Sequence, residues 1–286
     1  MLQGRLGPAL AALALAVAGC GAGASGTAAP ATRRPATTGA ASPAPDPRLA
    51  AAAARVHAAL RRLAAQGRPV YCGGRARRWV AFTFDDGPGP YTKLAVRILS
   101  AAHVPATFFL VGRNLAPFRS SLRVEQRIGA LGDHTWTHPD LATLAPSAVV
   151  QQMASAQRGI ERASGRSVQL FRPPYGARDA TVDRTARRLG LVEVLWTVDS
   201  ADSLGASYAQ IARNVLAGLR PGAIVLMHEN RGQTIRALKF YVLPKLRRAH
   251  VRLVTVPQLL SGDPPTPAQL ARGARGCGAP ARRTGA

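Results

Sequence analysis

Two adjacent carboxylates mark a short motif, TFDDGPGP, at residues 83–90. Asp85 and Asp86 end an apolar run and are followed at once by Gly87 and Pro88, which are typical of a tight turn. Because successive strand residues point to opposite faces, a turn is needed to bring both carboxylates into one site. One carboxylate could then bind a metal ion while the other acts as a general base, although the motif alone is equally typical of a surface turn.

A second motif, DHTWTH, places His134 and His138 four residues apart. This spacing puts both imidazoles on one face of either a helix or a strand, and Pro139 disfavours a helix at His138. Two histidines and one carboxylate are a usual ligand set of catalytic zinc. A histidine pair alone is more often structural, so the prediction depends on a third ligand and a base, which Asp85 and Asp86 can supply.

Short apolar runs alternate with amphipathic segments from Trp79 onward, which predicts an α/β fold with parallel strands and helices outside them. The runs lie at 79–84, 106–112, 168–171, 192–198, 223–227 and 252–256, and the helical segments at about 91–101, 147–163, 179–189, 207–218 and 233–248. In a (β/α) barrel the carboxyl ends of the strands meet on one face. Ionisable residues follow four of the runs at that end: Asp85 with Asp86, Arg172, Asp199 with Asp202, and His228 with Glu229.

Five motifs, TFDDGP, HTWTH, RPPYG, DSAD and LMH, occur in the order and rough spacing of one known family. Over roughly residues 78–262 the chain resembles the polysaccharide deacetylases, which carry the NodB homology domain of carbohydrate esterase family 4. The resemblance implies a distorted (β/α) barrel of the NodB type. It also implies a hydrolase that removes N-acetyl groups from a polysaccharide.

The resemblance assigns a metal site and a base. Asp86, His134 and His138 would hold a divalent metal, most often Zn²⁺, with Co²⁺ or Ni²⁺ as alternatives. Asp85 would take a proton from the attacking water, and Arg172 would hold it ionised and oriented.

The resemblance also assigns an acid and a substrate pocket. His228 would protonate the leaving amine, because an amide leaves poorly unless its nitrogen is protonated. Asp202 would orient His228 and raise its pKa. The backbone near Tyr175 would stabilise the oxyanion, and Leu226 would line the pocket for the acetyl methyl group.

Two features depart from the family pattern. The family usually has a Trp where Ser203 follows Asp202, which puts the shape of the acetyl pocket in doubt; Trp196 lies further back. The segment before the histidines is a few residues short, which predicts a truncated or register-shifted third strand. Asp133 in this segment is either an outer hydrogen-bond partner of the site or a solvated turn residue.

The N-terminus predicts export. Residues 1–20 contain an early Arg5 and an apolar stretch too short to be a good transmembrane helix, so they read as a signal peptide. Their ending, VAGC, resembles the lipobox of bacterial lipoproteins, which implies a lipid on Cys20 that holds the chain at the outer face of the cytoplasmic membrane. An ordinary signal cut near Ala24 or Ala28 is the alternative.

Composition divides the remainder of the chain into segments. Residues 21–47 form a linker rich in Ala, Pro and Thr, 48–77 a helical lead-in, 78–262 the catalytic domain, and 263–286 a loose basic tail. Outside the signal, Cys72 and Cys277 either form a disulfide or remain free thiols. The net charge of +24 predicts attraction to anionic wall polymers or lipid headgroups. No basic–aromatic motif accompanies the charge, so a nucleic-acid partner is not expected.

These observations predict a metal-dependent deacetylase of a cell-envelope polysaccharide. Peptidoglycan is the favoured substrate because a lipid anchor would keep the enzyme beside it, with chitin-like oligomers and acetylated xylan as alternatives. A hydrolase of small amides or imides on the same fold is a second hypothesis. A wall-binding protein with weakened catalysis is a third.

Overall fold

The computed structural model of the chain describes residues 46–246 and 248–278. The predicted signal peptide, the lipid site at Cys20 and the linker up to residue 45 lie outside the described residues, as do residues 279–286 of the tail. None of the described helices is both long and apolar enough to span a membrane.

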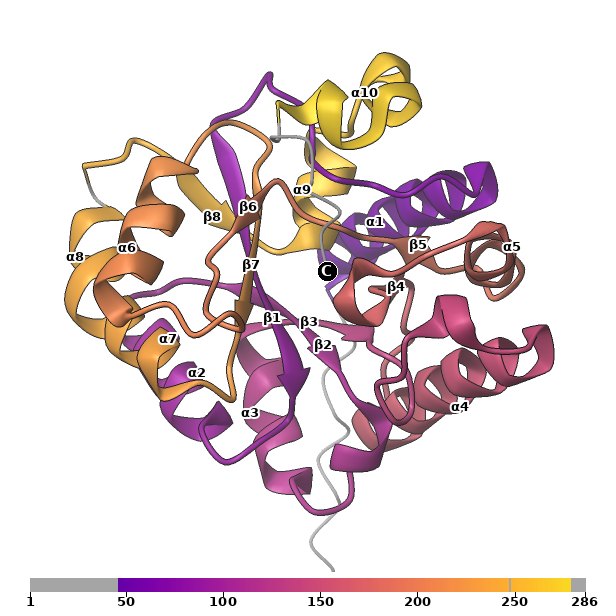
Figure 1. Cartoon of the computed structure of the whole chain (residues 1–286). Helices are drawn as coiled ribbons and strands as arrows, with labels where there is room; N and C mark the ends of the chain where they lie inside the picture. Colours follow the sequence, from indigo (N-terminus) through magenta and orange to yellow (C-terminus); the bar gives the residue numbers. More distant parts are fainter. Residues whose placement is uncertain (1–45, 247, 279–286) are drawn as a thin grey trace, which may run out of the picture. The chain divides into compact units, whose positions relative to one another are not determined.

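A curled sheet of parallel strands forms the centre of the fold (Figure 1). Its order is β5-β4-β3-β2-β1-β7-β6, and β8 pairs with β1 off this path. The strands are β1 Trp79–Gly87, β2 Ala106–Leu110, β3 Gly129–Asp133, β4 Leu170–Phe171, β5 Val192–Glu193, β6 Val198–Asp199, β7 Ile224–His228 and β8 Arg252–Val254. The distorted (β/α) barrel predicted from the sequence is confirmed.

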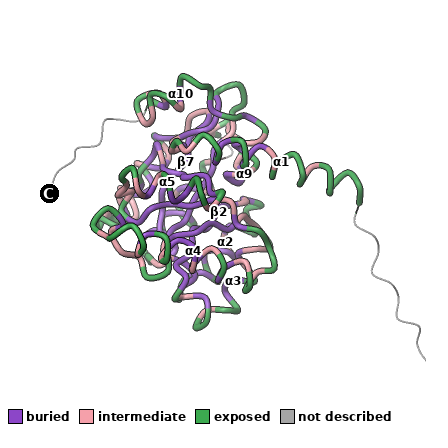
Figure 2. Tube along the Cα trace, turned by 90° about the vertical axis from the view of Figure 1, so that its right-hand side faces the viewer, coloured by how far each residue is buried: buried purple, intermediate pink, exposed green. Residues whose placement is uncertain are grey.

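Helices surround this sheet, with their buried faces inward and their exposed turns outward (Figure 2). They are α1 Pro47–Gln66, α2 Thr92–Ala101, α3 Arg119–Ile128, α4 Pro146–Ser164, α5 Ala180–Arg188, α6 Tyr208–Ala217, α7 Gly232–Ala237, α8 Leu243–Leu246, α9 Val256–Gly262 and α10 Pro267–Arg272. Single-turn helices are η1 Gly112–Asn114, η2 Leu141–Thr143, η3 Pro174–Gly176, η4 Leu238–Val242 and η5 Gly273–Cys277. Local signals set several ends: α4, for example, starts with Pro146 and stops at Gly165, which is left-handed.

Alternation along the strands separates the core from the site. In β1, Phe82 and Phe84 belong to the main hydrophobic cluster, which packs against the outer helices. Thr83 and Asp85, which alternate with them, are buried but face the other side of the strand. The same period in β7 directs His228 away from this cluster. The inner side of the barrel therefore carries polar and ionisable side chains.

The apolar run at 192–198 is not the single strand predicted from the sequence. It forms β5 and β6, which lie at opposite edges of the sheet. The chain between them crosses from one edge to the other, and Val194 in this crossing also bridges to Val70 of the lead-in segment. Most of the run is apolar because it is buried in the strands and in the crossing alike.

The third strand is neither truncated nor shifted, so that expectation is wrong. β3 pairs with β2 residue for residue, from Ala106 opposite Gly129 to Leu110 opposite Asp133. The shortening is absorbed in the connection, because α3 ends at Ile128 and β3 begins at the next residue. A Cβ at Gly129 would come within 2.2 Å of the Ala106 carbonyl oxygen, so glycine permits this abrupt start.

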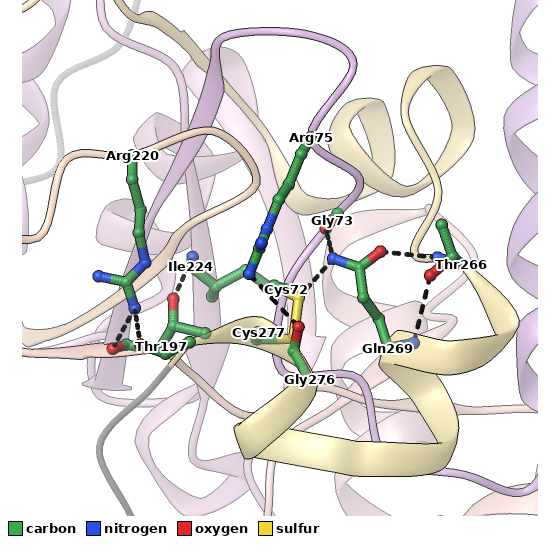
Figure 3. The surroundings of a disulfide bond; sticks show 11 residues. Cys72, Gly73, Arg75, Thr197, Arg220, Ile224, Thr266, Gln269, Gly276 and Cys277 are labelled. Carbon is green, nitrogen blue, oxygen red and sulfur yellow. Dashed lines mark hydrogen bonds between the residues drawn. A yellow bond between two sulfur atoms is a disulfide. The ribbon is translucent and has the colours of Figure 1, made fainter.

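The first part of the tail is ordered rather than loose. α10 and η5 occupy residues 267–277, and a disulfide joins Cys72 to Cys277 with a Cα–Cα distance of 5.8 Å (Figure 3). Gln269 of α10 adds a hydrogen bond from its side-chain amide to the Gly73 carbonyl. The tail is held because it is covalently tied to the segment that precedes β1.

Replacing Cys72 with Ser is expected to lower the free energy of unfolding by about 2–5 kcal/mol, because the bond closes a loop of 205 residues. Denaturant titration with and without reductant measures this. Reductant should destabilise the wild type and leave a Cys72→Ser/Cys277→Ser chain unchanged. Equal sensitivity of both chains would contradict the prediction.

Candidate active site

Three side chains converge at the carboxyl ends of β1 and β3 in an arrangement that could hold a metal ion. Nitrogen and oxygen atoms of Asp86, His134 and His138 all lie within 4.8 Å of one another. The Asp86 Oδ1 atom is 3.2 Å from His138 Nε2 and 3.7 Å from His134 Nε2. Two imidazoles and a carboxylate suit a divalent cation such as zinc and leave coordination positions for other ligands.

The tautomer of His134 fits this ligand role. Its Nδ1 atom lies 2.7 Å from the Arg172 carbonyl oxygen. Because a carbonyl only accepts, Nδ1 carries the proton and Nε2 keeps its lone pair toward Asp86. Burial lowers the pKa of His134, against an opposing effect of Asp85 and Asp86, so the imidazole is held neutral. A neutral imidazole is the form that binds metal.

Asp86 is held from two sides. Asn230 donates from Nδ2 to Asp86 Oδ2 at 3.3 Å, and Asn114 donates from Nδ2 to the Asp86 carbonyl at 3.0 Å. Burial alone would raise the pKa of Asp86, but the hydrogen bond from His138 and the charges of nearby imidazoles bring it well below its usual value. The carboxylate is therefore ionised. Sequence reasoning missed both asparagines; only Asn230, two residues after His228, stood near a motif.

The backbone at the site is strained in several places. Asp86, His138 and Tyr175 have φ values of 72°, 67° and 59°, in a left-handed region that residues other than glycine seldom adopt. Such conformations cost about 1–3 kcal/mol each and persist only where the surroundings enforce them. Their grouping around one set of side chains indicates a functional site.

Gly87 completes the corner after the two carboxylates, and the Gly87–Pro88 peptide bond is cis. A Cβ at Gly87 would lie 1.5 Å from Glu229 Oε1, so no larger residue fits there. Glu229 is buried against Glu125, and burial raises the pKa of both, that of Glu229 to about 7. Glu229 thus supports the corner from behind and does not join the site as its position after His228 suggested.

Asp85 lies beside the metal set, fixed by a buried arginine. Arg172 Nη1 is 2.8 Å from Asp85 Oδ1 and 2.7 Å from the Thr83 hydroxyl oxygen. Arg172 also donates to the carbonyls of Val194 and Leu195, in the crossing between β5 and β6. The guanidinium is fully buried and held at several atoms, so it fixes the position of the Asp85 side chain through a charge-assisted hydrogen bond.

His228 lies opposite Asp85, because β1 and β7 pair these two residues in register. Its Nδ1 atom is 2.7 Å from Asp202 Oδ1, while its backbone N–H donates to Asp202 Oδ2 at 2.7 Å. The Thr234 hydroxyl also donates to Asp202 Oδ2. Burial lowers the pKa of His228, but the hydrogen bond and charge of Asp202, with smaller effects of Asp85 and Asp86, raise it to about 9. The imidazole is therefore cationic near neutral pH and able to donate a proton.

Two further predicted residues border the site. The Tyr175 ring meets the His138 ring edge to face at 4.8 Å between centroids, so the Tyr175 side chain borders the metal set. Leu226 is buried on β7, two residues before His228 and hence on the same side of the strand. It belongs to neither hydrophobic cluster, and its place on the strand puts it on the same side as His228.

Not every predicted residue joins the site. Asp199 is exposed, and its carboxylate accepts from the Ala201 N–H and the Trp196 indole. Asp133 is completely buried and accepts from the Thr135 N–H, so it is not a solvated turn residue. It holds the start of the histidine loop, one residue from His134.

Comparisons with known proteins show the family to which this chain belongs. The family model described as polysaccharide deacetylase matches residues 73–194. A chitooligosaccharide deacetylase of Bradyrhizobium is 36% identical over 199 residues, which cover 64% of this chain and 90% of that protein. The chain belongs to the polysaccharide deacetylase family. It is accordingly a hydrolase with a NodB-type barrel.

Solved structures of the family show the same fold. A peptidoglycan N-acetylglucosamine deacetylase is 30% identical to this polysaccharide deacetylase, with a TM-score of 0.63 over 66% of this chain and 91% of the other. A pseudoenzyme of carbohydrate esterase family 4 from Bacillus anthracis reaches the same TM-score at 29% identity, over 67% and 68% of the two chains. The fold is thus equally similar to that of an enzyme and to that of a pseudoenzyme. An argument for activity therefore has to rest on the side chains of the site.

The departure after Asp202 changes the rim of the site. Ser203 donates its N–H to Asp202 Oδ1 at 2.8 Å, and the following Leu204 is 82% exposed. The Trp196 ring, further back in the sequence, stacks with the Arg172 guanidinium at 5.5 Å from its centroid. Directly after Asp202 the deacetylase therefore has Ser203 and an exposed Leu204, without a tryptophan.

Replacing Asp202 with Asn should move the alkaline limb of the pH–kcat/KM profile to lower pH. His228 donates a proton only while it is protonated, so activity is retained below its pKa and lost as the pH rises through it. Asp202 raises that pKa, and its loss of charge lowers it. Initial rates of acetate release from pH 6 to about 10 measure the limb. An unmoved limb would show that His228 is not the acid.

Proposed function

We propose that this chain is a zinc-dependent deacetylase of an N-acetylated envelope polysaccharide, with peptidoglycan as substrate. The proposal is based mainly on one observation: a carboxylate and an imidazole face each other beside the three side chains that could hold a metal. Asp85, paired with the buried Arg172, faces His228, which Asp202 holds in its cationic form, across neighbouring strands. Hydrolysis of an amide needs one group to accept a proton from water and another to protonate the leaving nitrogen.

Each of these residues has a separate role in the proposed hydrolysis. Asp85 Oδ2 accepts the proton of the attacking water, while Arg172 keeps the carboxylate in place through Oδ1. His228 donates its proton to the amide nitrogen, and Asp202 stabilises the imidazolium. Held by the Asp86, His134 and His138 side chains, a zinc ion would supply polarisation of the acetyl carbonyl and of the water. The other candidate ions, Co²⁺ and Ni²⁺, suit the same ligands.

The openness of the site favours a glycan over a small amide. Tyr175, which contacts His138, is 66% exposed, and Leu204, two residues after Asp202, is 82% exposed. The Asp86 and His138 side chains each have 20% of their surface exposed. A small-molecule site normally encloses most of its ligand, whereas a polymer needs a surface that it can cross. The relatives named as chitooligosaccharide and peptidoglycan deacetylases support the same substrate class.

The test uses the full chain, stripped of metal and then resupplied with zinc. Acetate release is measured on N-acetylglucosamine oligomers and on peptidoglycan. Zinc-dependent release from a glycan is the expected result, and the faster polymer identifies the substrate. Tight zinc binding with no acetate from either glycan would overturn the proposal and favour the wall-binding alternative, for which Ser203 is the relevant departure.

We place the protein at the outer face of the cytoplasmic membrane, held by a lipid on Cys20. The sequence VAGC and the following linker support this. Replacing Cys20 with Ser should move the protein from the membrane fraction to the medium. Fractionation and immunoblotting measure the distribution, and unchanged membrane retention would rule out the lipid anchor.

The surface charge supports a further partner, the anionic polymers of the wall. All 14 acidic residues lie within the described ranges, and three of them are exposed: Asp46, Asp179 and Asp199. The many exposed arginines therefore meet little compensating charge. Retention on purified wall material should fall as salt is raised. Salt-independent retention would argue against this electrostatic contact.

A further inference from the structure

A surface pocket of about 320 Å³ lies beside the loop that carries His134 and His138. Trp136 stands between these two histidines in sequence and forms one wall. Gln152 of α4 accepts the backbone N–H groups of Trp136 and Thr137 at 3.1 and 2.9 Å, so the helix and the loop are directly joined. The other lining residues all lie on α4: Gln151, Gln152, Ser155, Arg158 and Arg162.

The pocket has a positive charge that the described residues do not compensate. Arg158 and Arg162 are exposed, one helical turn apart, and neither forms a hydrogen bond or ion pair within the described ranges. The nearest acid on α4, Glu161, instead accepts from the Val168 N–H at 3.0 Å. Like charges four residues apart slightly destabilise a helix. A carboxylate ligand would relieve this repulsion, because a guanidinium binds carboxylate through paired N–H groups.

The aromatic wall of the pocket is fixed in orientation. Trp136 packs over Gly112 and Gly159, where a Cβ would lie 2.3 and 3.0 Å from the ring. It keeps 37% of its surface exposed. A rigid, half-exposed indole offers an apolar face for a sugar ring, with polar groups close by to orient the ligand.

We propose that this pocket is a subsite for a carboxylate-bearing peptide branch of the glycan substrate. The sugar lies against Trp136, and the carboxylate binds Arg158 and Arg162. This rests on the deacetylase function proposed above and makes it more specific. N-acetylglucosamine oligomers carry no carboxylate, so the pocket distinguishes peptide-bearing peptidoglycan from chitin-like chains.

The test is an Arg158→Gln/Arg162→Gln double variant of the full chain. Its KM for peptide-bearing glycan fragments should rise about tenfold with kcat unchanged, because neither arginine belongs to the groups that are proposed to react or to hold the metal. Its KM for N-acetylglucosamine oligomers should not change. The matched control is Arg119→Gln/Arg123→Gln, which removes two exposed arginines four residues apart on α3 and should affect neither substrate. An equal rise for both glycans, or an equal effect of the control, overturns the subsite.

A binding measurement separates this proposal from the proposed reaction. In an Asp85→Asn background, calorimetry gives the Kd of glycan fragments with and without their peptide. The wild-type pocket should bind the peptide-bearing form about tenfold more tightly, and the difference should vanish in the double variant. If the wild type released no acetate but the difference in Kd remained, the deacetylase proposal would be wrong and the subsite would be retained. If the two fragments had equal Kd values but acetate was still released, the subsite would be wrong and the deacetylase proposal would be retained.

Discussion

Asp85→Asn is expected to reduce kcat for acetate release about 10³-fold while the chain still binds zinc. Asn has the same shape and keeps the oxygen that accepts from Arg172, so the local geometry is retained. It cannot accept a proton from water. Asp85 also lies outside the group of three side chains suited to a metal, so the affinity for zinc should change little.

Steady-state kinetics on N-acetylglucosamine oligomers and the zinc content after dialysis test this separation. The melting temperature serves as the control for folding. If Asp85→Asn retained full turnover, the base would have to be another group. If it lost zinc together with activity, Asp85 would be a ligand and its assignment would pass to the metal set.

Asp86→Ala has the second large expected effect, the loss of both zinc and turnover. Asp86 is the carboxylate of the candidate metal set, with Oδ1 between two imidazole nitrogens. Removing it deletes a ligand, so zinc affinity should fall by more than the roughly 10–100-fold that outer partners contribute. Competition with a chelator of known affinity measures the zinc Kd.

Asn230→Ala provides a graded control, because Asn230 donates to Asp86 Oδ2 without belonging to the ligand set. Its zinc affinity should fall within the range of about 10–100-fold, and added zinc should restore activity. Added zinc should not rescue Asp86→Ala. If Asp86→Ala bound zinc like the wild type, the three-residue site would be wrong.

The third strand illustrates where reasoning from the sequence failed. A segment a few residues short of the family pattern predicted a slipped strand and displaced histidines. The chain instead shortens the connection between α3 and β3, and Gly129 permits the close approach to β2. The length of a segment shows that residues are missing but not which element is shortened. The register of β3 is fixed by its pairing with β2, which the sequence does not show.

The prediction of a single strand at residues 192–198 was wrong for a related reason. Its apolar residues predicted one strand, yet β5 and β6 lie at opposite edges of the sheet. Burial on both sides makes a strand and a buried crossing equally apolar, so periodicity does not separate them. The pairing partners that distinguish them are distant in sequence.

The sequence by itself determined the fold class and the residue types available for chemistry. Alternating apolar runs indicated the barrel, and ionisable residues at the ends of the runs named Asp85, Asp86, Arg172 and His228, because the carboxyl ends of parallel strands share one face. Such patterns are local, so they can be read along the chain.

Only the tertiary structure decided which of these residues meet. It buried Glu229 behind Gly87 and left Asp199 at the surface, although both follow strands as the site residues do. It also brought Asn114 and Asn230 to Asp86 from distant segments, and placed the Arg172 guanidinium against Asp85. The orientation of a side chain at a strand end depends on the curl of the sheet and on left-handed turns such as that at Asp86, which long-range packing enforces.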